Sequence, residues 1–261
     1  MTHHKTFSLL PHLAAQCLAA ALAAGVAMTA LAGSPASELR TAAHQALPPA
    51  PRAVPAASGK EKAAEKAEKA EKEAKLEAWR ENMTAYLSRA YRVPRSRIEQ
   101  IVEASIEAGR QNDIDPLLLL SITAAESTFN PKARNARSGA SGLMQVLPAA
   151  HAHRFKKRDG GIFDIETNLQ VGAELLRELI DKTGSLQRGL KHYMGAALLS
   201  HDSGYGNRVT REHSRLKLAA GGDVSQAVSL HRSRMPAESF EQKISGTFSE
   251  FKEWLTGAPV N

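Results

Sequence analysis

Apolar residues between residues 82 and 220 recur with the spacing of α-helices. After Ser96, four aliphatic residues share one helical face: Ile98, Ile101, Val102 and Ile106. Residues 117–125 are apolar on nearly every side, a pattern typical of a helix buried at the centre of a domain. No two segments show the period-two alternation of paired β-strands, so the pattern predicts an all-α fold.

Helix start and stop residues divide the rest of this region. Asp115 followed by Pro116 is typical of a helix start, because the carboxylate accepts from free backbone N–H groups and proline fits the first turn. Asp164 is expected to begin a further helix with one apolar face, and Gly184 to end it. Ser185 is expected to begin the next helix, and residues 208–220 form the last helix of this region.

The N-terminal segment has the pattern of a leader. Residues 13–32 are almost wholly apolar, and the small residues before Gly33 fit a cleavage site, so residues 1–32 are predicted to be a secretory signal peptide. An uncleaved membrane anchor is the alternative, because the apolar run approaches the roughly 20 residues that span a bilayer. Cleavage would remove Cys17, the one cysteine of the chain.

Three segments flank the domain expected at residues 82–220. Residues 33–59 are rich in proline and alanine and predict an extended linker. Residues 60–81 hold seven basic and seven acidic residues without an apolar seam before Leu76, which predicts a solvated spacer, helical or disordered. Residues 221–261 form a C-terminal extension in which an amphipathic helix is expected to pack on the core.

Composition excludes several classes of site. A single cysteine in 261 residues leaves no internal disulfide framework and no cysteine-based zinc site. His151 and His153 have no convincing third ligand nearby, so no metal or other cofactor is expected. An aromatic content of 5% argues against a nucleic-acid platform. The net charge of +7 and the basic run of residues 154–158 fit a solvated loop or contact with an anionic polymer.

The candidate chemistry begins at Glu126, near the end of the apolar helix. A carboxylate there is expensive to bury, so it is either paired or has a raised pKa and works as an acid. No acidic residue follows between Ser127 and Arg158. Gly142 allows close backbone approach to a ligand, and the amide of Gln145 suits a polar substrate.

These residues carry a resemblance. The stretches ESTFNP at residues 126–131 and GASGLMQ at residues 139–145 resemble the soluble lytic transglycosylase (SLT) family of the lysozyme-like superfamily. Two further blocks, at residues 164–172 and 190–196, follow in the family's order. The chain departs from the family pattern at three places: Asn135, Leu147 and Met194, which stands where the family has an asparagine after Tyr193.

The resemblance implies a lysozyme-like catalytic domain that cleaves the β-1,4 bond between N-acetylmuramic acid and N-acetylglucosamine in peptidoglycan. Glu126 matches the family's catalytic glutamate, which acts first as acid and then as base, so that the product carries a 1,6-anhydromuramic end. The residues that match substrate-binding positions, with the departures noted above, are Gln145, Tyr193, Met144, Ser127, Asn135 and Gly142.

Several of these positions have a structural alternative. Tyr193 is a candidate to hydrogen-bond Glu126 or the substrate, and a core tyrosine is the alternative. Asp164 and Asn168 are expected to be a helix cap and a structural polar residue.

Two other functions stay open from the sequence. A hydrolytic lysozyme-like muramidase would need a second carboxylate, for which Asp159 and Asp164 are the nearby candidates. A non-catalytic wall-binding scaffold protein would not need Glu126. In each case the expected partner is peptidoglycan in the periplasm, with contact to the membrane only if the leader is uncleaved. The sequence leaves open whether a secretion-system or wall-assembly protein also binds.

Overall fold

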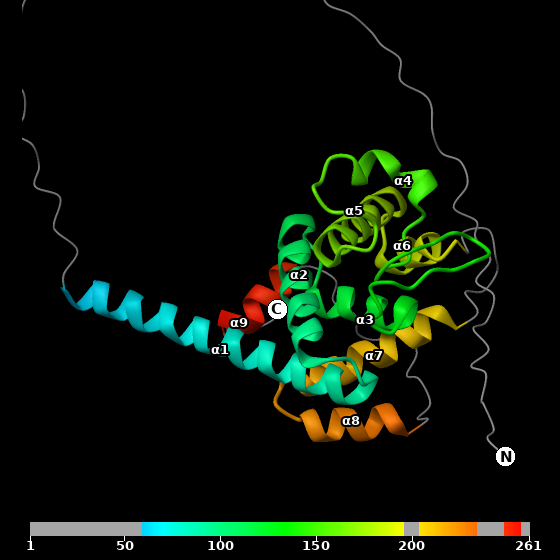
Figure 1. The fold of residues 1–261 in the computed structure, drawn as a ribbon. Coiled ribbons are helices and arrows are strands. Elements are labelled where there is room, and N and C mark those ends of the chain that lie inside the picture. The colour runs from blue at the N-terminus through cyan, green and yellow to red at the C-terminus, as the bar shows by residue number, and fades with distance from the viewer. Residues whose placement is uncertain (1–58, 196–203, 234–247, 257–261) are drawn as a thin grey trace, which may run out of the picture. The chain divides into compact units, whose positions relative to one another are not determined.

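The structure is a computed structural model that describes residues 59–195, 204–233 and 248–256. Every regular element in these ranges is a helix, and the backbone pairs as in a sheet only at two isolated bridges, Arg134–Ser141 and Ser141–Val146. The all-α fold expected from the sequence is therefore confirmed (Figure 1). The expected signal peptide and nearly all of the expected linker lie outside the described residues.

The helices follow one another along the chain as α1 (Gly59–Tyr91), α2 (Arg95–Asn112), α3 (Pro116–Ser127), α4 (Pro148–Phe155), α5 (Ile165–Thr183), α6 (Leu186–Tyr193), α7 (Tyr205–Ala220), α8 (Val224–Arg232) and α9 (Phe248–Thr256). None of these described helices combines the length and the apolarity that crossing a bilayer requires.

Three helix starts predicted from the sequence are confirmed. Asp115 accepts a hydrogen bond from the backbone N–H of Leu117, Asp164 from Thr167, and Ser185 from Arg188. The last helix of the expected domain differs, because α7 begins at Tyr205, three positions before the expected start. These extra residues belong to the helix because Gly204, at φ +74°, takes the left-handed conformation that turns the chain into it.

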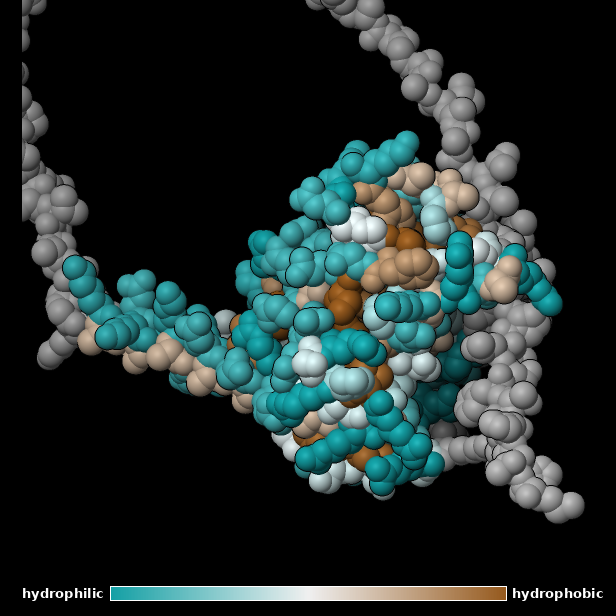
Figure 2. Space-filling view, in the orientation of Figure 1, coloured by the Kyte–Doolittle hydropathy of each residue, from teal (hydrophilic) through white to brown (hydrophobic). Residues whose placement is uncertain are grey.

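The chain divides into two compact units, with the boundary between residues 69 and 70 within α1. Residues 62–69, the part of α1 in the first unit whose side chains are described, are exposed, as the charged sequence predicts. On the face drawn in Figure 2, hydrophilic side chains predominate along α1. This first part of the charged segment is therefore helical, with its side chains in solvent.

In the second unit, the latter half of α1 belongs to the core. Trp79 is only 1% exposed, and its ring lies 5.1 Å from that of Phe251 in α9, edge to face. The boundary expected between residues 81 and 82 falls inside this helix. The physical reason is that apolar residues recur at helical spacing from Leu76 onward. The helix therefore continues past the charged residues, and its later turns pack against the core.

The C-terminal extension adds two helices to the same core. Ala227 and Val228 of α8 are buried, and α8 packs against α7. The amphipathic helix expected in the extension is present as the short α9, which buries Phe251. The earlier residues of the expected apolar face, Phe240 and Ile244, lie outside the described residues.

The helix α3 lies at the centre of the second unit. Its residues Leu118, Leu119, Leu120 and Ile122 have no exposed surface. It packs between α2 and α7, while α5 packs against α2 and α6 (Figure 1). Because α3 is surrounded in this way, the side chains in its last turn are held by rigid neighbours.

Candidate active site

Glu126 lies in the last turn of α3, where the central helix reaches the surface. The chain then leaves the helix abruptly, since Thr128 (φ 51°) and Phe129 (φ 63°) are both left-handed. This conformation is unfavourable for residues other than glycine, and the buried ring of Phe129, 4.7 Å from Tyr91, holds it in place. Glu126 is thereby fixed in a half-buried position at the end of an apolar helix.

The hydroxyl of Tyr205, at the start of α7, donates a hydrogen bond of 2.8 Å to Oε1 of Glu126. Tyr205 is 1% exposed, and the guanidinium of Arg208 lies 5.6 Å from its ring centre. Tyr205 is not among the residues that the sequence pattern indicates. The sequence offers only a tyrosine between two glycines, Gly204 and Gly206, and this pattern does not indicate contact with a residue 79 positions away.

The surroundings of Glu126 favour its protonated form. Burial raises the pKa of Glu126 to about 7, against the opposing effects of the hydrogen bond from Tyr205 and the positive charge of Arg208. Burial, and after it the charge of Glu126, raise the pKa values of Tyr193 and Tyr205 as well. Near neutral pH the site therefore holds a carboxyl group for which both the protonated and the charged form are accessible, beside two neutral tyrosines.

A buried amide organises the loop between α3 and α4. Asn168 of α5 donates to the carbonyl oxygens of Ser141 (3.2 Å) and Ile162 (2.8 Å), and it accepts from the N–H of Met144 (2.8 Å). Gly142, at φ +84°, passes so close that a Cβ there would lie 2.1 Å from Nδ2 of Asn168. The structural role expected for Asn168 is confirmed, and the glycine is explained by close approach to this amide.

Met144 and Tyr193 connect this loop to the core. Met144 matches an expected substrate-binding position, and its side chain has no exposed surface and packs where a Cβ on Gly172 would lie. Its carbonyl oxygen accepts a hydrogen bond of 2.8 Å from the hydroxyl of Tyr193. Tyr193 is itself 2% exposed, and the charge of Glu126 contributes to its raised pKa.

The other expected substrate-binding side chains hydrogen-bond nearby backbone. Nε2 of Gln145 donates to the carbonyls of Gly142 (2.9 Å) and Ala133 (3.3 Å). Asn135 accepts from the N–H groups of Arg137 and Ser138, which makes a tight turn. Ser127 donates to the carbonyl of Thr123, one turn earlier in α3. These contacts give each residue a local structural role, whether or not it also contacts substrate.

Neither candidate for a second carboxylate is associated with Glu126. Asp164 caps α5, and with Asp159 it lines a groove of about 860 Å³ to which Glu126 does not contribute. Among the described residues, no acidic side chain contributes to the shifted pKa of Glu126. The described part of the site therefore presents one carboxyl group, a tyrosine hydroxyl and an arginine.

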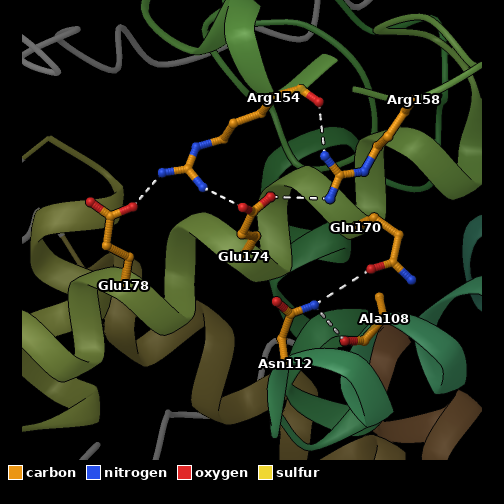
Figure 3. A network of polar contacts seen from close by, with 7 residues as sticks. All are labelled: Ala108, Asn112, Arg154, Arg158, Gln170, Glu174 and Glu178. Carbon is orange, nitrogen blue, oxygen red and sulfur yellow. Dashed lines mark hydrogen bonds and ion pairs between the residues drawn. The ribbon is translucent and has the colours of Figure 1, made fainter. Parts of the chain in front are cut away.

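The basic run after α4 is largely neutralised by α5. Arg154 pairs with Glu174 (2.8 Å) and with Glu178, while Arg158 pairs with Glu174 (3.1 Å) and donates to the carbonyl of Arg154 (Figure 3). These arginines therefore attach α4 to α5, and Lys156 and Lys157 are the exposed charges of the run. Within the described residues, no group of three or more potential ligands is placed to hold a metal ion.

The region that holds this site is similar to a known family of domains. Residues 103–217 match the family model described as the transglycosylase SLT domain. Over 91 residues the chain is 34% identical to the transglycosylase of Enterobacteria phage PRD1, a match that covers 34% of this chain and 32% of the phage protein. Over 83 residues it is 31% identical to the soluble lytic murein transglycosylase of Salmonella typhimurium, covering 29% of this chain and 13% of that protein.

The chain thus matches about a third of the phage protein's length and about an eighth of the Salmonella protein's length. No solved structure is significantly similar to it.

Proposed function

Because residues 103–217 match the model of the transglycosylase SLT domain family, we propose that the protein is a lytic transglycosylase that cleaves the bond between N-acetylmuramic acid and N-acetylglucosamine in peptidoglycan. The observation that carries the proposal is the environment of Glu126. Its carboxyl group is half-buried, has a pKa of about 7 and accepts a hydrogen bond from the hydroxyl of Tyr205. A group with this pKa can both give and take a proton near neutral pH.

In the proposed reaction, protonated Glu126 gives its proton to the glycosidic oxygen as the bond to the anomeric carbon breaks. The resulting carboxylate then takes the proton of the muramic C6 hydroxyl, whose oxygen attacks that anomeric carbon. The products are a free N-acetylglucosamine 4-hydroxyl and a 1,6-anhydromuramic end, and Glu126 returns to its protonated form. Because the nucleophile belongs to the substrate, proximity replaces a second carboxylate.

Tyr205 and Arg208 would support both forms of Glu126. The tyrosine hydroxyl fixes Oε1, which leaves the second oxygen of the carboxyl to exchange the proton with the substrate. When Glu126 is charged, the same hydrogen bond and the charge of Arg208 stabilise the carboxylate. The opposing effects on the pKa thus keep the two protonation states close in free energy.

Peptidoglycan as substrate implies that the protein works on the periplasmic side of the inner membrane. The expected leader of residues 1–32 would supply export, and the expected linker and charged helix would separate the domain from it. We therefore expect the mature protein to act on glycan strands outside the cytoplasm.

The product of digestion in heavy-oxygen water tests the reaction. A lytic cut closes the ring with an oxygen of the sugar, so mass spectrometry of the new ends should show anhydro products without solvent oxygen. A hen-type lysozyme digest of the same sacculi, run in parallel, supplies the hydrolysed reference. One heavy oxygen per cut would contradict the proposal and favour the hydrolytic muramidase.

The rate of cleavage is expected to fall as the pH rises through about 7, because only the protonated form of Glu126 can donate to the leaving oxygen. Each pH unit above the pKa lowers the protonated fraction, and with it the rate, about tenfold. Release of soluble fragments from purified sacculi, followed across this range, measures the profile, and circular dichroism at each pH controls for unfolding. An alkaline limb near the ordinary carboxyl value of 4.5 would contradict the assigned acid.

A further inference from the structure

The helices α3 and α7 pack side by side, and two polar contacts join them at separate points. At one point Tyr205 bonds Glu126, and at the other Nε2 of His213 lies 3.3 Å from Oδ2 of Asp115. The two contacts show that the helices run antiparallel. At a rise of about 1.5 Å per residue, the two contacts lie about 16 Å apart along α3 and about 12 Å apart along α7.

The second contact is made by two buried side chains. Asp115 is 5% exposed and His213 is 1% exposed. Oδ1 of Asp115 accepts from the N–H of Leu117 and caps α3, so Oδ2 is the oxygen left for His213. A carboxylate oxygen can only accept, so Nε2 of His213 carries the hydrogen.

We propose that His213 is a positioning residue, whose hydrogen bond to Asp115 fixes α7 along the axis of α3 and so holds the hydroxyl of Tyr205 against Glu126. Apolar side chains between two helices favour contact, but neighbouring axial positions differ little in the area they bury. A single buried polar pair makes one axial position much more favourable, because any other leaves a buried donor and acceptor unpaired.

A second group of polar contacts on α7, made by Glu212, joins α7 to α1 and not to α3. Glu212 accepts a hydrogen bond of 2.6 Å from the hydroxyl of Tyr86 and pairs with Arg215 at 3.0 Å. Tyr86 belongs to α1, so this contact attaches α7 to α1 and leaves its position along α3 free. The contact between Asp115 and His213 joins the start of the helix that carries Glu126 to the helix that carries Tyr205.

The pKa of Glu126 reports whether Tyr205 is in place. The groups that act on it are Tyr205 and Arg208 from α7, and the carboxylate in turn acts on Tyr193 from α6. Since the bond from Tyr205 lowers the pKa of Glu126, displacing the hydroxyl raises it. A carbon-13 label on the glutamate carboxyl groups allows this pKa to be measured by NMR in the full-length protein, with Glu126→Gln used to assign the signal.

The test compares three variants. His213→Leu, which fills the space but removes the hydrogen bond, is expected to raise the pKa of Glu126, as Tyr205→Phe does. His213→Gln keeps a donor and should restore the wild-type value. Thr210→Val removes a buried hydroxyl of α7 that donates to the carbonyl of Gly206 in the same helix, and it should leave the pKa unchanged.

The effects of His213→Leu and Tyr205→Phe on the pKa of Glu126 should not be additive. In a Tyr205→Phe background, His213→Leu should produce no further rise, because the bond it protects is already absent. With peptidoglycan, His213→Leu should lower kcat between about ten- and a hundredfold with little change in KM, as expected for a displacement of about 1 Å at the reacting group.

An unchanged pKa in folded His213→Leu, with a raised one in Tyr205→Phe, would overturn the proposal. If His213→Leu fails to fold, Asp115→Ser replaces it, because serine still caps α3 but is too short to reach His213. The kcat readout rests on the proposed function, but the titration needs no substrate. It therefore succeeds or fails independently of whether Glu126 cleaves peptidoglycan.

Discussion

Glu126→Gln is expected to lower the rate of peptidoglycan cleavage by at least about a hundredfold, because the amide can neither donate nor take the proton that the proposed reaction moves. The variant keeps the shape of the side chain, and its carbonyl oxygen can still accept from Tyr205. Quantifying the fragments released from purified sacculi measures the loss. Glu99→Gln, an exposed change of the same kind on α2, serves as the control and should retain full activity.

The same variant should be at least as stable as the wild-type protein. Burial holds the folded-state pKa of Glu126 above its unfolded value, so ionisation of this group destabilises the fold as the pH rises from about 4.5 towards 7. Glutamine has no charge to bury, and its melting temperature at alkaline pH should therefore be higher. A cleavage rate within about tenfold of the wild type, in a protein that melts normally, would contradict the assignment of the acid.

Asn168→Ala is expected to lower the free energy of unfolding by about 3 kcal/mol, since three buried backbone groups lose their partners at once. These groups are the N–H of Met144 and the carbonyls of Ser141 and Ile162. Urea denaturation followed by circular dichroism measures the change. Activity should fall as well, because the freed loop is joined through the carbonyl of Met144 to Tyr193, whose pKa responds to Glu126.

A second asparagine, Asn112, serves as the control for the loss of a side-chain amide that does not organise a loop. Asn112 of α2 is half-buried and bonds the carbonyl of Ala108 one turn earlier, with Gln170 at 3.5 Å (Figure 3). Asn112→Ala is expected to cost under about 1 kcal/mol, because solvent can replace these bonds. Equal losses in the two variants would show that Asn168 does not organise the loop.

The features that the sequence predicted are those set by near neighbours in the chain. The caps at Asp115, Asp164 and Ser185 bond residues two or three positions away, and the apolar run before Glu126 determines both its helix and its burial. Such signals need no knowledge of the tertiary fold. The acid itself was therefore identifiable from its place on a buried helix, and the family resemblance gave it a role.

The features that the sequence did not predict arise from contacts between distant residues. Tyr205 meets Glu126 only after α7 packs on α3. Met144 was assigned to substrate binding, but the absence of a side chain at Gly172, on another helix, opens the space that buries it. Likewise, the domain boundary expected at residue 82 was placed where the density of charged residues falls. Trp79 lies before that boundary, and its packing depends on Phe251 near the other end of the chain.

The cluster between α1 and α9 also determines what the protein's intrinsic fluorescence can report. The chain has two tryptophans, and both lie there: Trp79 contacts Phe251, and Trp254 stacks on the same ring. Trp79 is buried and Trp254 is 43% exposed, so undocking of α9 would transfer the indole of Trp79 into water and shift its emission to longer wavelength. Tryptophan emission therefore follows the attachment of the C-terminal helix, which lies outside the residues that match the SLT domain.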